Sequence, residues 1–267
     1  MMIRTLISSF FLVSSVWAID FKGQFIQGGY VTAQVNSNTQ VILNGQSVPV
    51  TPEGRFALGF GRDFPSTATI EIQYPNGNKD VFTRTIAKRE YKIQRINGLP
   101  PKKVNVPESR LKRIRAESKL VREARAQRLT HTDFLGGFIW PTQGTITGVY
   151  GSQRILNGEP RRPHFGIDVA APTGTPVKAP AGGTITMTHD DMYFSGGTLL
   201  LDHGYGVNSA FLHLDKILVK EGDVVKQGDV IATVGATGRV TGPHLDWRMN
   251  WLDQRIDPQL LVEPITP

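Results

Sequence analysis

Three histidines and two aspartates lie in short segments whose spacing suits a metal ion. His244 and Asp246 are two residues apart, so a strand would place both on one face, with apolar neighbours on the other. His164 and Asp168 form a second pair, and His213 stands alone in an apolar run, where an unpaired polar group is costly. Together these residues predict a zinc hydrolase centre.

The residue types indicate how such a centre would work. A catalytic zinc takes about three protein ligands and leaves one position open, and His164, Asp168 and Asp246 can supply them. The chain has no cysteine, which excludes thiolate catalysis and cysteine-bound zinc. Zinc lowers the pKa of a bound water, and the hydroxide can attack an amide carbonyl. His213 and His244 then remain to move protons and stabilise the oxyanion.

Several motifs around these residues recur in one order along the chain. They are Phe-Ile-Trp-Pro at 138–141, Thr-Gly-Val-Tyr-Gly at 147–151, the segment 164–177, Asp-His-Gly-Tyr-Gly at 202–206, Phe-Leu-His-Leu at 211–214 and Thr-Gly-Pro-His-Leu at 241–245. In this order they resemble the lysostaphin or LytM-type zinc metallopeptidases of peptidoglycan, over about residues 136–260. The resemblance implies a β-sheet groove of the duplicated-hybrid-motif type, with His164 and Asp168 as zinc ligands and His213 and His244 as catalytic histidines.

Asp246 departs from that family, in which a histidine is the third ligand. The swap replaces a neutral ligand with an anion, so we expect a working site that is more alkaline or less selective for zinc over other divalent ions. The alternative is a degenerate relative that regulates other wall hydrolases or binds peptidoglycan. Four of five positions match and Asp246 is still a competent ligand, so the enzyme is favoured.

The resemblance implies a substrate as well. Relatives cut stem peptides or cross-links of the wall, and similarity suggests a D-alanyl-diaminopimelate endopeptidase. Arg161 and Arg162 precede the first ligand and can pair with wall carboxylates, although loops also carry arginines for solubility. Tyr205 can donate to the oxyanion or simply pack in the cleft. His203 is expected to hold its own loop by hydrogen bonds.

The first 18 residues have the pattern of a secretory signal. A basic start is followed by an apolar run to Val16 and a small residue, Ala18. We therefore expect an exported protein, in the periplasm or cell envelope of a Gram-negative bacterium. No later segment is apolar enough to span a membrane.

The remaining chain predicts an all-β protein in three parts. Residues 19–98 alternate polar and apolar side chains, with Asn-Gly turns at 44–45 and 76–77, and indicate a small β-sandwich-like, Ig-like module without catalytic residues. Residues 99–131 form a basic helical linker, with a helix from Pro107 to Leu129. Residues 132–267 carry short β-like runs and predict a largely antiparallel peptidase domain.

The linker holds the charge excess. Residues 101–130 contain ten Lys or Arg against three Glu, which equals the whole-chain net charge of +7. Export makes an anionic envelope polymer or membrane surface a better partner than nucleic acid, and a solvated helix explains the charge equally well. We expect its apolar stripe, which includes Val121 and Ala124, to pack while its Arg and Lys face water. The helix is also placed to cover the cleft.

Overall fold

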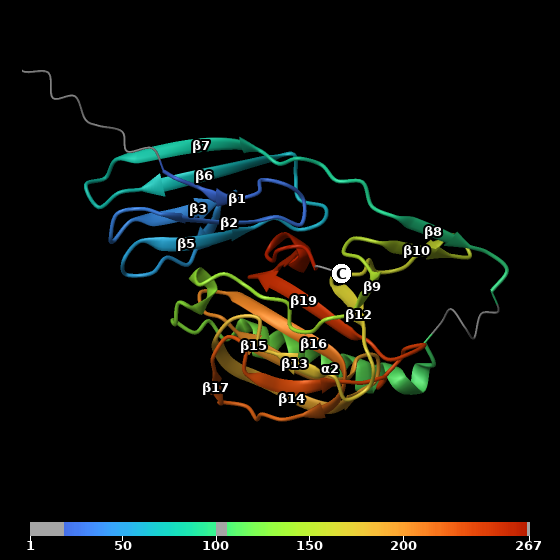
Figure 1. Ribbon diagram of the computed structural model, residues 1–267. Helices are drawn as coiled ribbons and strands as arrows, with labels where there is room; N and C mark the ends of the chain where they lie inside the picture. The colour runs from blue at the N-terminus through green and yellow to red at the C-terminus, as the bar shows by residue number, and fades with distance from the viewer. Residues whose placement is uncertain (1–18, 100–105, 266–267) are drawn as a thin grey trace, which may run out of the picture.

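The computed structural model describes residues 19–99 and 106–265 (Figure 1). The predicted signal segment, residues 1–18, lies outside the described residues. Two β regions lie one above the other, with the N-terminal strands on one side and the longer C-terminal sheet on the other (Figure 1). The all-β prediction is confirmed, with one long helix, α2 (Glu108–Ala126).

The N-terminal region consists of two antiparallel sheets. One has the order β1-β2-β5 and the other β4-β3-β6-β7. The strands are β1 (Lys22–Gly23), β2 (Tyr30–Gln34), β3 (Gln40–Leu43), β4 (Gln46–Val48), β5 (Arg55–Gly59), β6 (Thr67–Gln73) and β7 (Lys79–Thr85). In β6 every second residue is buried, Ala68, Ile70 and Ile72, and the residues between them are polar. This alternation explains why the segment forms a strand with one face on the core.

The C-terminal region is built on a ten-stranded sheet. Its main path has the order β17-β14-β15-β16-β19-β12-β9, and β13, β18 and β20 pair beside that path. The strands are β9 (Thr145–Gly148), β12 (Ile167–Ala170), β13 (Pro176–Lys178), β14 (Gly183–Met192), β15 (Gly196–Asp202), β16 (Val207–Ile217), β17 (Val224–Val225), β18 (Val230–Val234), β19 (Leu245–Trp251) and β20 (Gln254–Ile256). Its strand pairs are antiparallel, as predicted. Two short 3-10 helices, η1 (Asp133–Leu135) and η2 (Pro258–Leu260), flank the sheet in sequence.

A small fourth sheet joins the two regions. Strand β8 (Ile93–Ile96) runs parallel to β10 (Gln153–Leu156), which also pairs with β11 (Glu159–Pro160). The sequence grouped β8 with the N-terminal module, but its hydrogen-bonded partner is β10, in the C-terminal region. The final strand of the first region therefore lies beside the segment that leads to His164.

The two regions also pack directly on each other. At Gly59 in β5 a side chain has no room, because a Cβ would lie 2.8 Å from the Cβ of Trp251 in β19. Arg89 forms an ion pair of 2.8 Å with Asp257, whose side chain is only 1% exposed. Buried apolar residues of both regions form one continuous cluster. The two regions therefore share their main apolar core.

Helix α2 packs on one face of the large sheet, behind β15 and β16 in Figure 1. Ala124 is buried against Leu200, Ala210 and Leu212, and Val121 packs beside it. Both residues belong to the predicted apolar stripe. Glu117 links the helix to the sheet. Its carboxylate accepts hydrogen bonds of 2.9 and 3.1 Å from the backbone N–H of Tyr193, the residue that follows β14.

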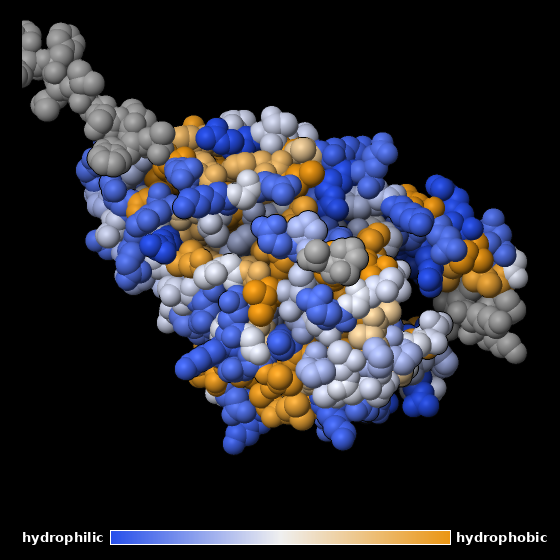
Figure 2. All heavy atoms as spheres, viewed as in Figure 1, coloured by the Kyte–Doolittle hydropathy of each residue, from blue (hydrophilic) through white to orange (hydrophobic). Residues whose placement is uncertain are grey.

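The surface is mixed in character. Hydrophilic side chains dominate the face in Figure 2, and apolar ones form separate patches. Among the described residues the most exposed large apolar side chains are Val224, Val81 and Leu218, which lie in different elements. No helix in the described part of the chain has the length and apolar character needed to cross a membrane.

Candidate metal centre

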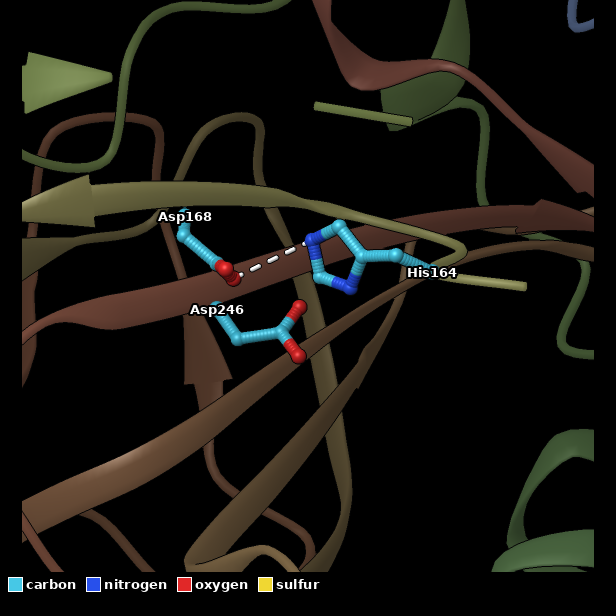
Figure 3. A group of neighbouring side chains, drawn as sticks. All are labelled: His164, Asp168 and Asp246. Carbon is cyan, nitrogen blue, oxygen red and sulfur yellow. Dashed lines mark ion pairs between the residues drawn. The ribbon is translucent and has the colours of Figure 1, made fainter. Parts of the chain in front are cut away.

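Strand pairing brings the three predicted ligands together. Asp168 in β12 lies directly opposite Asp246 in β19, and His164 reaches back from the loop before β12. One ligand atom from each residue lies within 4.8 Å of the others, and the three side chains converge in Figure 3. The site is buried at Asp246 and partly exposed at the other two.

Two of these atoms lack the partner that burial demands. His164 Nε2 and Asp168 Oδ1 are enclosed and 3.1 Å apart, but neither has a partner in hydrogen-bonding geometry. Burial alone would lower the pKa of His164, yet the two neighbouring carboxylates outweigh it and raise that pKa. An imidazole and carboxylates facing one point fit a shared cation, since their lone pairs then become ligands.

His213 joins the site through an irregular backbone. Leu212 lies opposite Asp246, so a regular strand would turn His213 to the other face of the sheet. His213 instead has a φ of 66°, a left-handed value that is uncommon for a residue with a side chain. Its ring lies 4.8 Å from the ring of His244, measured between centroids. The backbone departure therefore brings the second histidine to the metal face.

Backbone carbonyls orient both histidine rings. His213 Nδ1 lies 2.9 Å from the carbonyl oxygen of Thr237, and His244 Nδ1 lies 2.9 Å from that of Gly242. A carbonyl only accepts hydrogen bonds, so each Nδ1 carries the proton and each neutral ring keeps a free lone pair on Nε2. Burial lowers the pKa of His213, which favours this neutral form. Both rings are suited to accept a proton at Nε2.

Arg248 is a member of the site that sequence analysis missed. Its Nε donates to both carboxylate oxygens of Asp246, at 3.0 and 3.1 Å. Burial would raise the pKa of Asp246, but the guanidinium holds it below its usual value. The charge that Asp246 adds relative to a histidine is therefore matched by Arg248. The signal was present, because Arg248 follows Asp246 by two residues and so shares its face.

Two glycines make room for the carboxylates. A Cβ on Gly148 would lie 2.0 Å from Oδ2 of Asp168, and one on Gly166 would lie 2.4 Å from Oδ1 of Asp246. Neither distance is compatible with a side chain. Both glycines belong to the motifs quoted above, but their steric role follows only from the pairing of β9, β12 and β19.

The three residues expected to bind substrate lie in different surroundings. Arg162 lines a cavity next to His213, and its guanidinium lies 5.5 Å from the ring centre of Phe165. Arg161 has an enclosed Nε without a hydrogen-bond partner. Tyr205 lies in the turn between β15 and β16 and packs on Phe134 at 5.7 Å between ring centres. That turn is eight residues from His213, or about 26 Å along a strand, so Tyr205 does not join the metal centre.

His203 has a structural role, but its hydrogen-bond partners lie outside its own loop. It is fully buried, with Nδ1 2.7 Å from the carbonyl oxygen of Gly182 and Nε2 2.7 Å from the hydroxyl of Ser209. Burial lowers its pKa to about 4. The ring is thus a neutral part of the core and has no place in the metal chemistry.

Comparison with known proteins agrees with this geometry. Residues 162–258 match the model of peptidase family M23. The peptidoglycan DD-endopeptidase ShyB of Vibrio cholerae is 41% identical over 103 residues, which are 39% of this chain and 24% of ShyB. The DD-carboxypeptidase/endopeptidase Mpg of Neisseria meningitidis serogroup B is also 41% identical over 103 residues, with the same coverage. The match spans about a quarter of the length of these relatives.

A solved structure matches more of the chain. A crystal structure assigned to peptidase M23 from Pseudomonas aeruginosa covers 89% of this chain and 95% of its own, with 28% identity and a TM-score of 0.70. The similarity therefore extends beyond the metal region to most of the described fold.

Proposed function

Because residues 162–258 form a peptidase family M23 domain, we propose that this protein is an exported, zinc-dependent endopeptidase of peptidoglycan. Its substrates are amide bonds in stem peptides or cross-links of the wall. One observation carries the proposal: His164 Nε2 and Asp168 Oδ1 are enclosed as an ion pair of 3.1 Å, and one carboxylate oxygen of Asp246 lies within 4.8 Å of both. One imidazole and two carboxylates that converge in this way are a donor set that fits a divalent ion.

The metal ligands of the proposal are His164, Asp168 and Asp246. A zinc ion held there would polarise the amide carbonyl and make a water molecule acidic enough to react near neutral pH. Arg248 keeps Asp246 ionised and fixes the direction of its carboxylate. A donor set with two carboxylates also suits harder divalent ions, so the identity of the metal is part of what is tested.

His213 and His244 move the protons. Each ring is held through Nδ1, so Nε2 is free to take a proton from the attacking water. The protonated ring can then donate to the departing amine, which leaves as a neutral group, or to the developing oxyanion as a hydrogen bond. His213 is the more buried of the pair, and burial lowers its pKa, which keeps the ring neutral and its Nε2 available to accept a proton.

Peptidoglycan is proposed as the substrate because relatives of this chain are named as peptidoglycan endopeptidases. ShyB and Mpg are named as endopeptidases, and each resembles this chain at about two residues in five over the catalytic region. Export follows from the signal pattern in residues 1–18 and from the location of peptidoglycan outside the cytoplasmic membrane. The periplasm is the compartment that meets both conditions.

The proposal is tested on the protein from residue 19 onward. We expect one zinc ion per chain by elemental mass spectrometry, and release of peptides from purified sacculi with new amino termini. A chelator should stop the release, and added zinc should restore it. Protein that binds no divalent metal and releases no peptides would overturn the proposal. Fractionation of cells tests export separately.

A further inference from the structure

A cavity of about 600 Å³ lies between helix α2 and the large sheet. Leu212 and His213 line it from β16, and Arg248 lines it from β19, so the cavity lies next to the metal centre. Across the sheet Leu200, Ala210 and Arg248 lie in one row, which shows that α2 covers the same face that carries Asp168 and Asp246. Its size suits a short peptide segment or another small ligand.

Arginine dominates the charged part of the cavity lining. Six arginines border the cavity, and the single acidic residue that does so is Glu117. That carboxylate is already engaged by Arg113 at 2.6 Å and by a backbone N–H. The arginines are Arg122, Arg125, Arg162, Arg239, Arg248 and Arg255. The cavity therefore has a large excess of positive charge.

Arg125 shows how poorly this charge is balanced. It comes from the last turn of α2, and its Nε is enclosed without a hydrogen-bond partner. The sequence predicted that the basic side chains of this helix face water, which is wrong for Arg125, because packing of the neighbouring Ala124 turns this part of the helix toward the sheet. An enclosed guanidinium N–H without a partner is costly unless a ligand supplies an acceptor.

The neighbouring guanidiniums raise that cost. Burial, followed by repulsion from Arg255, Arg248 and Arg162, lowers the pKa of Arg125 well below its usual value. Burial and repulsion from Arg162 and Arg248 lower the pKa of Arg255 to about 10. One negative charge among these groups would relieve the repulsion and satisfy their donors together.

We infer that this arginine-lined cavity binds a free carboxylate of the peptide substrate, next to the amide that is cut. The inference rests on the proposed function and names a substrate class for it: an acidic peptide in preference to its neutral amide. The apolar floor of the cavity, formed by Met192, Leu200 and Leu212, would hold the short aliphatic part of the same residue. Helix α2 thereby supplies one wall of a binding site through Arg125.

Binding of two probes to the zinc-loaded protein tests the inference without turnover. The probes are acetyl-Ala-Ala, which has a free carboxylate, and acetyl-Ala-Ala-amide, measured by isothermal titration calorimetry. We expect the acid to bind at least about 10-fold more tightly, the usual scale for hydrogen bonds between charged groups. Arg125→Gln and Arg162→Gln should each lower this preference about threefold or more, and the double variant should abolish it.

Arg115→Gln is the matched control, because Arg115 lies on the exposed side of the same helix and does not line the cavity. It should keep the preference of the unmodified protein. Arg162 is exposed and lies in a loop, so its variant remains informative if Arg125→Gln does not fold. A preference that survives in both arginine variants would mean that the carboxylate binds the metal, and would overturn the inference.

Inorganic phosphate distinguishes a substrate site from a general anion site. If phosphate displaces the acidic probe at equal concentration and the acid has no advantage over the amide, the assignment to a peptide carboxylate is wrong. Failure of the proposed function alone would give a different result. Sacculi would not be cut, but the unmodified protein would still prefer the acid and the arginine variants would still lack that preference. Cleavage of sacculi without any acid preference would overturn only the present inference.

Discussion

Strands β6 and β19 show how differently the two regions use the same alternation. In β6 one face is buried and apolar, and the other, with Thr69 and Glu71, is partly exposed. In β19 both faces are largely covered: Leu245, Trp247 and Met249 are fully buried on one side, and Asp246 is buried on the other. A strand with an apolar face and a covered polar face marks the functional sheet of this molecule.

The covered polar face exists because something lies over it. In the N-terminal region the outward side of the β4-β3-β6-β7 sheet has no helix on it among the described residues, so polar residues there meet water. In the C-terminal region α2 and the loop before β12 shield the equivalent side chains. Polar groups that water cannot reach need partners within the protein. The shielded carboxylates and His164 contact one another and Arg248, and they would also bind the proposed metal.

The largest expected effect compares the two polar faces directly. Asp246→Ala should lower zinc affinity by more than about 100-fold and abolish metal-dependent hydrolysis. Loss of a group that only supports a ligand typically costs about 10- to 100-fold in metal affinity, and loss of the ligand itself should cost more. Glu71→Ala, at a polar position of β6, should leave both unchanged. Zinc titration with a competing chelator measures the first quantity. Equal zinc affinity in the two variants would break the comparison.

His213→Ala separates catalysis from metal binding on that face. The rate of peptide release should fall roughly 10²- to 10⁴-fold, the range for loss of a general base, and zinc content should stay at one ion per chain. Single-turnover kinetics and elemental analysis of the same sample check both. Loss of the zinc together with the rate would show that His213 is needed to form the site.

Arg248→Gln tests how far the guanidinium of Arg248 balances the negative charge of Asp246. The metal-free protein should lose about 1–3 kcal/mol of stability, a range below that of a fully buried pair because the Arg248 side chain is 27% exposed. Zinc should bind more tightly, since a positive charge next to the site is gone and Asp246 needs a partner. Urea denaturation with and without zinc measures both effects. A variant with weaker zinc binding would show that Arg248 mainly orients Asp246.

The buried histidine of the C-terminal sheet predicts a pH dependence that the histidine-free N-terminal region lacks. Burial lowers the pKa of His203 in the folded protein to about 4, from its ordinary value of 6.5. Between these values the unfolded chain binds a proton that the folded protein does not, so stability falls as pH falls. At pH 5 the protonation of His203 in the unfolded chain lowers the free energy of unfolding by about 2 kcal/mol relative to neutral pH.

His203→Gln isolates that contribution. The variant loses hydrogen bonds at every pH, so only the slopes of stability against pH are compared, in metal-free protein. We expect a shallower loss of stability between pH 6.5 and pH 4 than in the unmodified protein. Parallel slopes would show that His203 titrates normally.

The smallest expected effect concerns the space around the carboxylates. Gly166→Ala should lower zinc affinity about 10-fold, because its Cβ would displace Asp246 or Arg248. Gly242→Ala is the control, since a Cβ there meets nothing within 4 Å. The same chelator titration compares them, and a similar affinity in both variants would show that the strand can shift to accept the methyl group.

The sequence predicted those parts of the structure that depend on local chemistry. The short β-like runs of residues 132–267 predicted the largely antiparallel C-terminal region, and the helix predicted from Pro107 to Leu129 corresponds to α2 at Glu108–Ala126. The three ligands and two histidines could be selected because imidazoles and carboxylates at two- and four-residue spacing have few structural roles in apolar runs. These features are encoded within a few residues of each other.

Only the tertiary structure decided what surrounds them. Asp168 and Asp246 meet because β12 pairs with β19, and the parallel pairing of β8 with β10 had no local signal at all. Sequence analysis expected Asp246 to make the site more alkaline or less selective for zinc, and this stays a prediction. The structure adds that the guanidinium of Arg248 lies against Asp246 and that a left-handed backbone turns His213 toward His244. Helix α2 brings Arg125 to the same face. Long-range packing selects such contacts, because an apolar stripe can bury itself on any matching surface and only the folded sheet offers this one.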